Sequence, residues 1–323
     1  MRLPVLLTAL MLTALPVAAQ ETLSDGQTLR EGRAIRDGEE WITDVVVTAR
    51  LPGPALWRVR KGDSQVYVLG AMPVMTKRVS WDSRRVERVI GLSNVLLTAP
   101  EAKGGLIGGT RLLMDRRLPL GKKLDEVLPA PLSQRFNALI DAHGLDREKY
   151  KKLSPLWAAA ALREDVYDKA GIATRDPEKT LLRFAKAQKL KTQPSGNFSV
   201  AKTLGRIDDF SQPQQMACVA ATLDEIDFAL KHARAATEAW AVGDLQTVQR
   251  LSPDSALLAC LEGAPSTKAM LGKAVEQTVG SITDALQTPG KSLIVLPLSA
   301  LLAPGGALQQ LEQQGATVTT PAL

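Results

Sequence analysis

The sequence has few of the side chains that most often carry chemistry. Its 323 residues include two histidines, His143 and His232, and two cysteines, Cys218 and Cys260. No Cys-x-x-Cys pair and no histidine cluster accompanies them, which excludes the common zinc and thiol-redox motifs. His143 stands at the predicted end of a helix, where a cation interacts well with the helix dipole, and His232 stands on a predicted solvated face. We interpret both histidines as capping or surface residues.

Nucleotide-binding and serine-hydrolase motifs are also absent. None of the three Gly-Lys pairs has the earlier glycine that a phosphate loop of the form Gly-x4-Gly-Lys requires. No Gly-x-Gly-x-x-Gly follows a predicted strand, and Gly-x-Ser-x-Gly does not occur. The one glycine-rich stretch, Gly104–Gly109, is therefore interpreted as a mobile loop at the rim of a sheet.

Aromatic residues make up 4% of the chain, and its charge is mildly basic. Forty Lys and Arg residues against 34 Asp and Glu residues give a formal net charge of +6, which is dispersed along the sequence. A surface that binds nucleic acid usually combines a basic patch with interleaved aromatic side chains or a recognisable motif, and neither is visible. We predict no nucleic-acid partner.

Long hydrophobic runs are missing except at the amino terminus. There, Arg2 precedes an apolar run from Leu3 to Leu15, and small residues end the segment at Ala19. This pattern is typical of a cleavable signal peptide over residues 1–19. The alternative, a transmembrane anchor, needs roughly 18 or more apolar residues, and this run is shorter. The sequence therefore predicts a periplasmic or secreted protein with no transmembrane segment after cleavage.

Export would place the two cysteines in an oxidising compartment. An even number of cysteines in an oxidising compartment favours a disulfide between Cys218 and Cys260. The alternative is a pair of buried free thiols. Closing a loop of this length would stabilise the fold by roughly 4 kcal/mol in the chain-entropy model.

The mature chain divides into a leader and one domain. Residues 20–53 are mostly polar and charged, which indicates a flexible leader, although the β-branched run Val45–Thr48 could add an edge strand or form an extended arm. Pro52-Gly53-Pro54 marks the boundary. Residues 54–323 have the length of a single large domain.

That domain begins with a strand, turn, helix, strand unit. Two short apolar runs between Leu56 and Gly70 flank the turn at Lys61–Asp63 and predict a β-hairpin. Ser80–Ser93 is predicted to be a helix capped by Ser80, and Val95–Thr98 a buried strand. Chemistry in such units sits just past the carboxyl end of the strand. The remaining pattern predicts helices at Leu124–Ile140, Leu153–Asp168, Thr180–Gln188, Met216–Ala241 and Ser266–Leu286, then a buried strand at Lys291–Pro297 and a final strand after Gly315.

Several of these stretches resemble the TraB/GumN (PrgY/Tiki-like) family. The similarity lies in five stretches of the sequence. They are Trp57–Gly70 with the spacer to Trp81, Gly144–Asp146, Ser154–Trp157, Gly171-Ile172, and Ala239–Asp244, which carries the pattern Trp-x-x-Gly-Asp. In Gly243-Asp244 the glycine is expected to end one helix and the aspartate to cap the next. The resemblance implies an α/β fold with a central mixed sheet, built from two pseudo-symmetric βαβ-type units with an inserted helical region. Relatives would bind metal and substrate in the cleft between the two units.

The family's metal-site residues are missing at the matching positions. Where relatives carry Gly-x-x-His after the first strand, this chain has Gly70 and Pro73, and Ala99 stands at the position of the following glutamate. The second Gly-x-x-His falls on Pro297 and Ala300. A further acidic position of the family falls near Gln193–Ser195. We therefore expect no metal, no cofactor and no catalytic residue at this degenerate site.

Three hypotheses remain for the function. The first is an exported, non-catalytic family member that binds an unknown ligand or envelope protein through the old cleft. The second is an exported hydrolase with a non-standard site, for which Asp82 and Glu101 are candidate carboxylates, although Asp82 is more simply a helix-starting residue. The third is an envelope or polysaccharide-related assembly factor whose cleft is filled by side chains.

Overall fold

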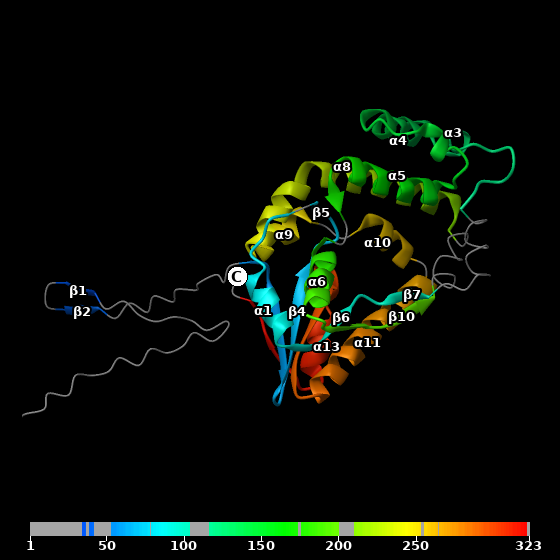
Figure 1. Cartoon of the computed structure of the whole chain (residues 1–323). Helices are drawn as coiled ribbons and strands as arrows, with labels where there is room; N and C mark the ends of the chain where they lie inside the picture. Colours follow the sequence, from blue (N-terminus) through cyan, green and yellow to red (C-terminus); the bar gives the residue numbers. More distant parts are fainter. Residues whose placement is uncertain are drawn as a thin grey trace, which may run out of the picture. The chain divides into compact units, whose positions relative to one another are not determined.

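The computed structural model describes residues 34–36, 39–41, 53–77, 79–103, 116–173, 176–199, 210–252, 255–263 and 265–321 (Figure 1). The chain divides into two units, Met1–Val47 and Thr48–Leu323. Three sequence predictions, the signal peptide, the strand at Val45–Thr48 and the loop Gly104–Gly109, lie outside the described residues.

The first unit contains a short antiparallel hairpin of β1 (Ala34–Arg36) and β2 (Glu39–Trp41). Most of residues 20–53 lie outside the described residues, so the flexible leader stays a prediction. Asp37-Gly38 stands between the two strands in the sequence, and such a pair is a strong local signal for a two-residue hairpin turn. In the register of the hairpin, Arg36 lies opposite Glu39.

The second unit is built on one six-stranded sheet with the order β12-β3-β4-β11-β6-β9. The predicted hairpin is confirmed, because β3 and β4 pair antiparallel with Lys61 opposite Ser64. Gly62 in the connecting turn has φ +58°, a left-handed conformation that favours glycine. The six strands are β3 (Leu56–Lys61), β4 (Ser64–Ala71), β6 (Ser93–Thr98), β9 (Lys191–Pro194), β11 (Gly290–Pro297) and β12 (Thr317–Thr319).

The two crossover units interlace within this sheet. One unit runs from β4 through α1 (Arg84–Gly91) to β6, yet β11 lies between β4 and β6 and pairs parallel with both. The other runs from β11 through α12 (Leu298–Leu302) and α13 (Ala307–Gln313) to β12, which lies beyond β3. The predicted α/β fold with a mixed central sheet is therefore confirmed. The strands β4, β11, β6 and β9 are parallel, so their carboxyl ends meet at one edge.

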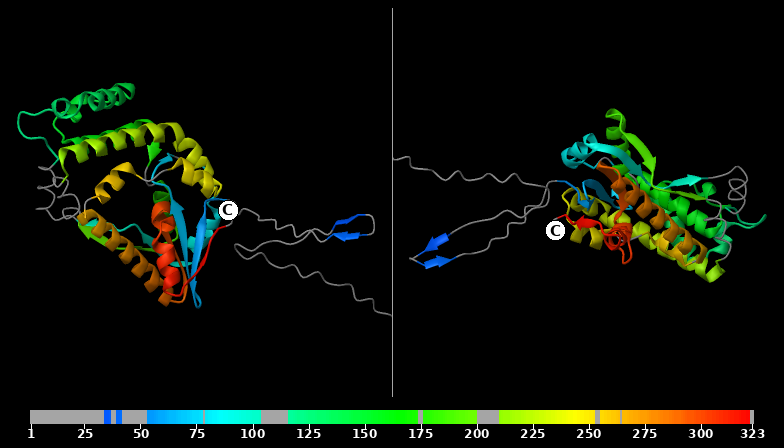
Figure 2. Two further views of the ribbon diagram at one scale, coloured as in Figure 1. Left: turned by 180° about the vertical axis from the view of Figure 1, so that it is seen from behind. Right: turned by 90° about the horizontal axis from the view of Figure 1, so that it is seen from below.

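Helices cover both faces of the sheet. Unbroken buried runs in β4 and β11 are what a strand covered on both sides requires. The helices α1 and α6 (Asp176–Ala187) lie along one face, and α11 (Pro265–Gln287) and α13 lie along the other (Figure 2). The predicted helix at residues 80–93 is shorter than expected. Ser83, not Ser80, precedes its first turn, and Ser93 already belongs to β6.

The inserted helical region has a core of its own. Its centre is made by α4, α5 and the amino-terminal half of α8, whereas the carboxyl-terminal half of α8 packs into the sheet core. Two short strands, β5 (Met75–Thr76) and β8 (Ile172–Ala173), pair antiparallel beside α8. The elements of this region are α3 (Leu124–Val127), α4 (Ala130–Ala142), η1 (Arg147–Lys149), α5 (Pro155–Lys169) and α8 (Gln212–Ala241).

Helix ends follow the predicted glycine and aspartate positions. Gly144, with φ +60°, follows α4, and Gly243, with φ +74°, follows α8. The side chain of Asp244 accepts a hydrogen bond from the Thr247 backbone N–H at 3.1 Å and so caps α9 (Leu245–Leu251). Among the described helices, none is long and apolar enough to cross a membrane.

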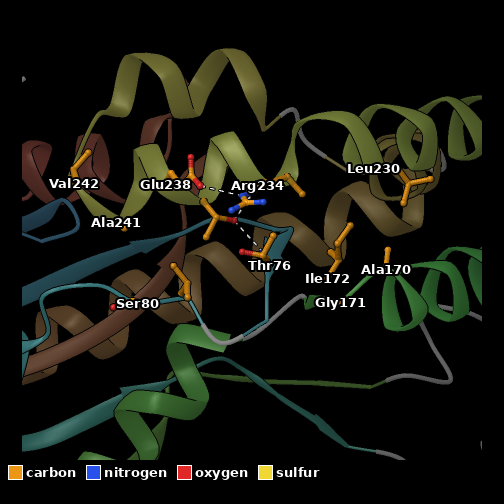
Figure 3. Close-up of a pocket in the computed structure, with 13 residues that line it drawn as sticks. Thr76, Ser80, Ala170, Gly171, Ile172, Leu230, Arg234, Glu238, Ala241 and Val242 are labelled. Carbon is orange, nitrogen blue, oxygen red and sulfur yellow. Dashed lines mark hydrogen bonds and ion pairs between the residues drawn. The ribbon is translucent and has the colours of Figure 1, made fainter.

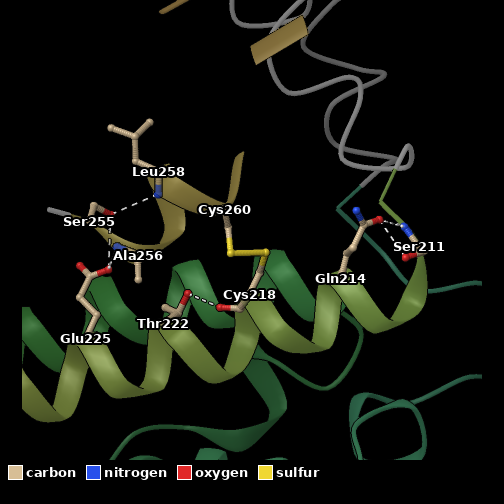
Figure 4. Close-up of a disulfide and its surroundings, with 9 residues drawn as sticks. All are labelled: Ser211, Gln214, Cys218, Thr222, Glu225, Ser255, Ala256, Leu258 and Cys260. Atoms are coloured by element: carbon tan, nitrogen blue, oxygen red, sulfur yellow. Dashed lines mark hydrogen bonds between the residues drawn. A yellow bond between two sulfur atoms is a disulfide. The ribbon is translucent and has the colours of Figure 1, made fainter. Parts of the chain in front are cut away.

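The cysteine pairing is confirmed as a disulfide-distance pair. Cys218 in α8 and Cys260 in α10 (Ala256–Glu262) have Cα atoms 5.7 Å apart, and their sulfur atoms are joined (Figure 4). The link fastens α10 to the long helix. One further short ladder joins β7 (Glu101–Lys103) to β10 (Asn197–Ser199) in parallel.

Candidate functional site

The fold brings the family's metal-site positions to one edge of the sheet. Gly70 lies opposite Leu296 in the β4–β11 register, so the segments after β4 and β11, with Pro73 and Ala300, start side by side. Ala99 follows the last residue of β6, the strand on the other side of β11. The positions that the family resemblance assigns to a metal site therefore lie at the edge where a crossover fold builds a site.

The space around Gly70 is filled by side chains. A Cβ atom added to Gly70 would stand 2.4 Å from Leu298 Cδ2 and 2.8 Å from the ring of Trp57. The Gly70 carbonyl accepts a hydrogen bond of 2.7 Å from the indole N–H of Trp240, which comes from the end of α8. The edge of the ring of Trp81 meets Trp240 at a centroid distance of 5.4 Å. Glycine is needed here because neighbouring side chains approach its backbone closely.

The residues at this edge do not fit the family's metal. Proline and alanine side chains have no donor atom, and a catalytic metal needs imidazole or carboxylate ligands at about 2.0–2.2 Å. The carboxylate of Glu178, from α6, accepts a hydrogen bond of 3.3 Å from the Ala99 N–H. Within the described part of the chain, no three His, Cys, Asp or Glu side chains converge to hold a metal ion.

The two candidate carboxylates of the hydrolase hypothesis have separate structural settings. Asp82 accepts hydrogen bonds from the Arg84 side chain and backbone N–H at the start of α1. The hydrogen bonds from Arg84 lower the pKa of Asp82 to about 2, so the carboxyl is ionised at neutral pH and has no proton to donate. Glu101 is exposed at the start of β7, where its backbone N–H donates to the Gly196 carbonyl at 2.9 Å. The structure records no contact between them.

The further acidic position of the family falls at the end of β9. Ser195 is 0% exposed, its hydroxyl lies 3.4 Å from that of Thr278, and its carbonyl accepts from Ser281. A serine enclosed in this way has no route to a substrate, so we assign it to the packing of β9 against α11.

A groove opens beside this edge, along the carboxyl-terminal half of α8. It has a volume of about 760 Å³ and lies between α8, the segment after β5 and the junction of α5 with β8 (Figure 3). Its lining is mostly apolar or small and carries hydroxyl groups and one charged pair. The lining residues are Thr76, Val79, Ser80, Ala170, Gly171, Ile172, Leu230, Ala233, Arg234, Thr237, Glu238, Ala241 and Val242.

Hydrogen bonds fix the floor of the groove, whereas charges stand at its rim. The buried hydroxyl of Thr237 donates to the Ala233 carbonyl at 2.6 Å and accepts from the Thr76 N–H at 3.0 Å, so β5 is tied to α8. Arg234 and Glu238 form an exposed ion pair at 3.2 Å. These side chains can recognise a ligand by shape, hydrogen bonds and charge.

Sequence reasoning missed this groove. The signal was present, because Leu230, Ala233 and Thr237 recur at three and four residues on one stripe of α8. Ser80, predicted as a helix cap, lines the groove instead.

Neither histidine enters the groove or the strand edge. His143 lies at the end of α4, as predicted. The prediction for His232 was wrong, because it is half-buried with its ring centroid 4.3 Å from that of Phe228. Phe228 lies four residues earlier on α8, a spacing at which two helical side chains meet.

Comparison with known proteins adds one finding. No curated protein and no solved structure matches the chain. The model of the TraB/PrgY/gumN family matches residues 55–320, which include every strand of the central sheet. The chain is therefore a member of the TraB/PrgY/gumN family.

Proposed function

We propose that this chain is an exported, non-catalytic family member that binds a ligand or an envelope partner through the groove along α8. The observation that carries the proposal is the packing around Gly70, where Leu298 and Trp57 occupy the space beside the strand end. A site whose positions lack donor atoms and whose neighbouring space is filled cannot hold a reacting metal and substrate together.

The groove supports the binding half of the proposal. A volume of about 760 Å³ falls within the range of about 300–1,000 Å³ that is typical of ligand sites. Its walls combine apolar area with a few polar groups that can fix the orientation of a ligand. No cysteine or histidine lines it, and its one carboxylate, Glu238, is paired with Arg234, so the lining favours binding over turnover.

Metal analysis tests the loss of family chemistry. We expect purified protein to contain no stoichiometric zinc or manganese and chelators to leave its Tm unchanged, because the aligned positions offer no ligands. As a matched comparison, Pro73→His with Ala99→Glu and Ala300→His should create measurable zinc affinity if the alignment is right. One tightly held metal per chain in the unmodified protein would refute the proposal.

Cross-linking tests the groove itself. A photoreactive amino acid at Val242, which is exposed at the groove, should capture a partner in the envelope, and Ala233→Trp should abolish capture by filling the groove. The same amino acid at Lys273, on the exposed side of α11, serves as the control. Capture that survives Ala233→Trp would exclude the groove as the binding site.

The same packing around Gly70 favours a second candidate, an envelope assembly factor that acts through its outer surface. This candidate predicts capture from positions outside the groove and no effect of Ala233→Trp. The cross-linking experiment therefore separates the two.

A further inference from the structure

A loop in the helical region holds a leucine fully in solvent. Leu120 is 105% exposed, the highest value among the large exposed apolar side chains of the described residues. The Lys122 N–H donates to the Pro119 carbonyl at 3.1 Å, which closes a four-residue turn, and Gly121 follows Leu120 with φ +87°. A positive φ at the third residue is characteristic of a type II turn. The turn itself therefore directs Leu120 away from the fold.

Basic side chains surround this turn on two paired segments. The segment 116–124 is hydrogen-bonded to the segment 149–154 through Leu118 N–H to Lys152 O at 2.9 Å and Leu124 N–H to Lys151 O at 3.0 Å. Together these segments carry seven cations, which we call the basic rim. They are Arg116, Arg117, Lys122, Lys123, Lys149, Lys151 and Lys152.

Only part of this charge is neutralised. Lys123, Lys149 and Lys151 form ion pairs with Glu126, Asp165 and Glu148. The other four cations form no ion pair with any residue that the structure describes. Arg116 is held with its guanidinium 4.9 Å from the ring centroid of Trp157, and Arg117, Lys122 and Lys152 are exposed. The basic rim thus keeps an excess of positive charge at the surface.

We propose that the Leu120 turn and the basic rim dock the protein on the surface of a membrane that contains anionic phospholipid. Lys and Arg near such a surface are attracted to the lipid phosphates, and an apolar side chain at the tip enters the boundary between head groups and acyl chains. The two features act together, because electrostatic attraction alone weakens sharply with salt. This inference is independent of the groove.

The partner is a lipid surface rather than an acidic protein because of the shape of the apolar contact. An interface with a protein usually buries a central patch of apolar side chains in a pocket, whereas here a single leucine projects from a turn whose paired segments carry the cations. A bilayer needs no complementary pocket. The tip needs only to reach the acyl boundary while the cations stay at the level of the phosphates.

Vesicle flotation tests the proposal. The chain that starts at Gln20 is used, because residues 1–19 would themselves bind lipid, and it retains the whole unit Thr48–Leu323. We expect it to float with phosphatidylcholine–phosphatidylglycerol vesicles and not with pure phosphatidylcholine. Leu120→Ser should weaken binding about tenfold, and Arg117→Glu with Lys152→Glu should weaken it at least about fivefold for each charge removed.

Matched variants control for exposure and for net charge. Leu258→Ser removes another exposed leucine, and Lys268→Glu with Lys273→Glu removes two exposed cations from α11. Both should bind like the unmodified chain, and thermal unfolding of every variant confirms that it folds. The proposal is overturned if the chain ignores anionic vesicles, or if binding persists in the Leu120 and basic-rim variants. Charge-dependent vesicle binding that is indifferent to Leu120→Ser would overturn the role of the Leu120 turn.

Discussion

Single residues account for the closure of the strand edge. Gly70 shares its space with Leu298 and Trp57, so the smallest side chain is the only one that fits without movement. The indole N–H of Trp240, which stands in α8 170 positions later in the chain, donates a hydrogen bond to the Gly70 carbonyl. The edge to which the family resemblance assigns a metal site is here a packed junction of three distant segments.

Gly70→Ala should therefore destabilise the fold. We expect a loss of about 1–3 kcal/mol, because the new methyl group overpacks a filled site. Leu298→Ala removes the nearest obstacle, so the double variant should lose less stability than the sum of the two single variants. Urea denaturation of the three variants measures this coupling. Strict additivity would mean that Leu298 does not restrict position 70.

Glu225 is the residue on which α8, α5 and α10 converge. It is 9% exposed and accepts a hydrogen bond from the Ala256 N–H at 2.8 Å (Figure 4). It also pairs with Arg163 of α5 at 3.1 Å. Burial, followed by the charge of Glu225, raises the pKa of the Tyr167 phenol. One carboxylate therefore caps α10 and neutralises a partly buried guanidinium.

Glu225→Ala should cost about 3 kcal/mol of stability, because it leaves the Arg163 guanidinium without its charged partner and the Ala256 N–H without its acceptor. Glu238→Ala is the matched control. It breaks an ion pair whose side chains are 87% and 68% exposed, and such pairs contribute about 0–1 kcal/mol. Denaturant unfolding compares the two variants. Equal losses would contradict the assigned role of Glu225.

The carboxyl of Asp82 gives a pH prediction. Its pKa in the folded protein is about 2, below the ordinary value of 3.8, because Arg84 donates hydrogen bonds to the ionised form. Because the pKa is lower in the folded protein, the ionised carboxyl stabilises the fold at pH values above its pKa in the unfolded chain. This contribution to stability disappears as the pH falls from about 4 towards 2. Carbon-detected NMR should find the Asp82 titration near pH 2. In Arg84→Ala, the Asp82 pKa should return towards 3.8, and a midpoint unaffected by this change would contradict the assigned cause.

At the scale of elements, α8 is the part that connects the two cores. Its 30 residues begin in the helical region and end against the sheet. The disulfide and Glu225 both fasten α10 to its first half, and the groove follows its second half.

Removing the disulfide should loosen this attachment. Cys218→Ser with Cys260→Ser opens a loop of 42 positions, for which the chain-entropy model predicts a loss of roughly 4 kcal/mol. Thermal unfolding with and without reductant measures it, and reductant should then have no effect on the double variant. Non-reducing peptide mapping should recover the two cysteine peptides joined. Complete alkylation of both thiols in unfolded, unreduced protein would contradict the bridge.

At the scale of the whole molecule, the prediction concerns export. The apolar run Leu3–Leu15 and the small residues that end at Ala19 predict a mature chain that begins near Gln20. Intact-mass measurement of protein from the periplasm or the medium checks the new amino terminus. A cytoplasmic product that retains Met1 would refute export, and with it the oxidising environment on which the sequence argument for the disulfide rests.

The sequence by itself determined the elements and several of their ends. Apolar spacing predicted the β3–β4 hairpin and the long helices, because periodicity records which face of an element is buried. Gly243 and Asp244 were predictable as caps, since their roles depend on the local backbone. The family positions and the absence of donor side chains at them were also readable from the chain.

The tertiary structure alone decided what covers each buried face. Periodicity does not reveal that β11 separates β4 from β6, because that pairing joins segments more than 190 residues apart. For the same reason it could not show Leu298 against Gly70 or the groove between α8 and β5. Leu120 looked like an ordinary loop leucine in the sequence. Its full exposure beside cations that have no ion-pair partner among the described residues follows from a turn and from a pairing with a second segment that only the folded chain brings together.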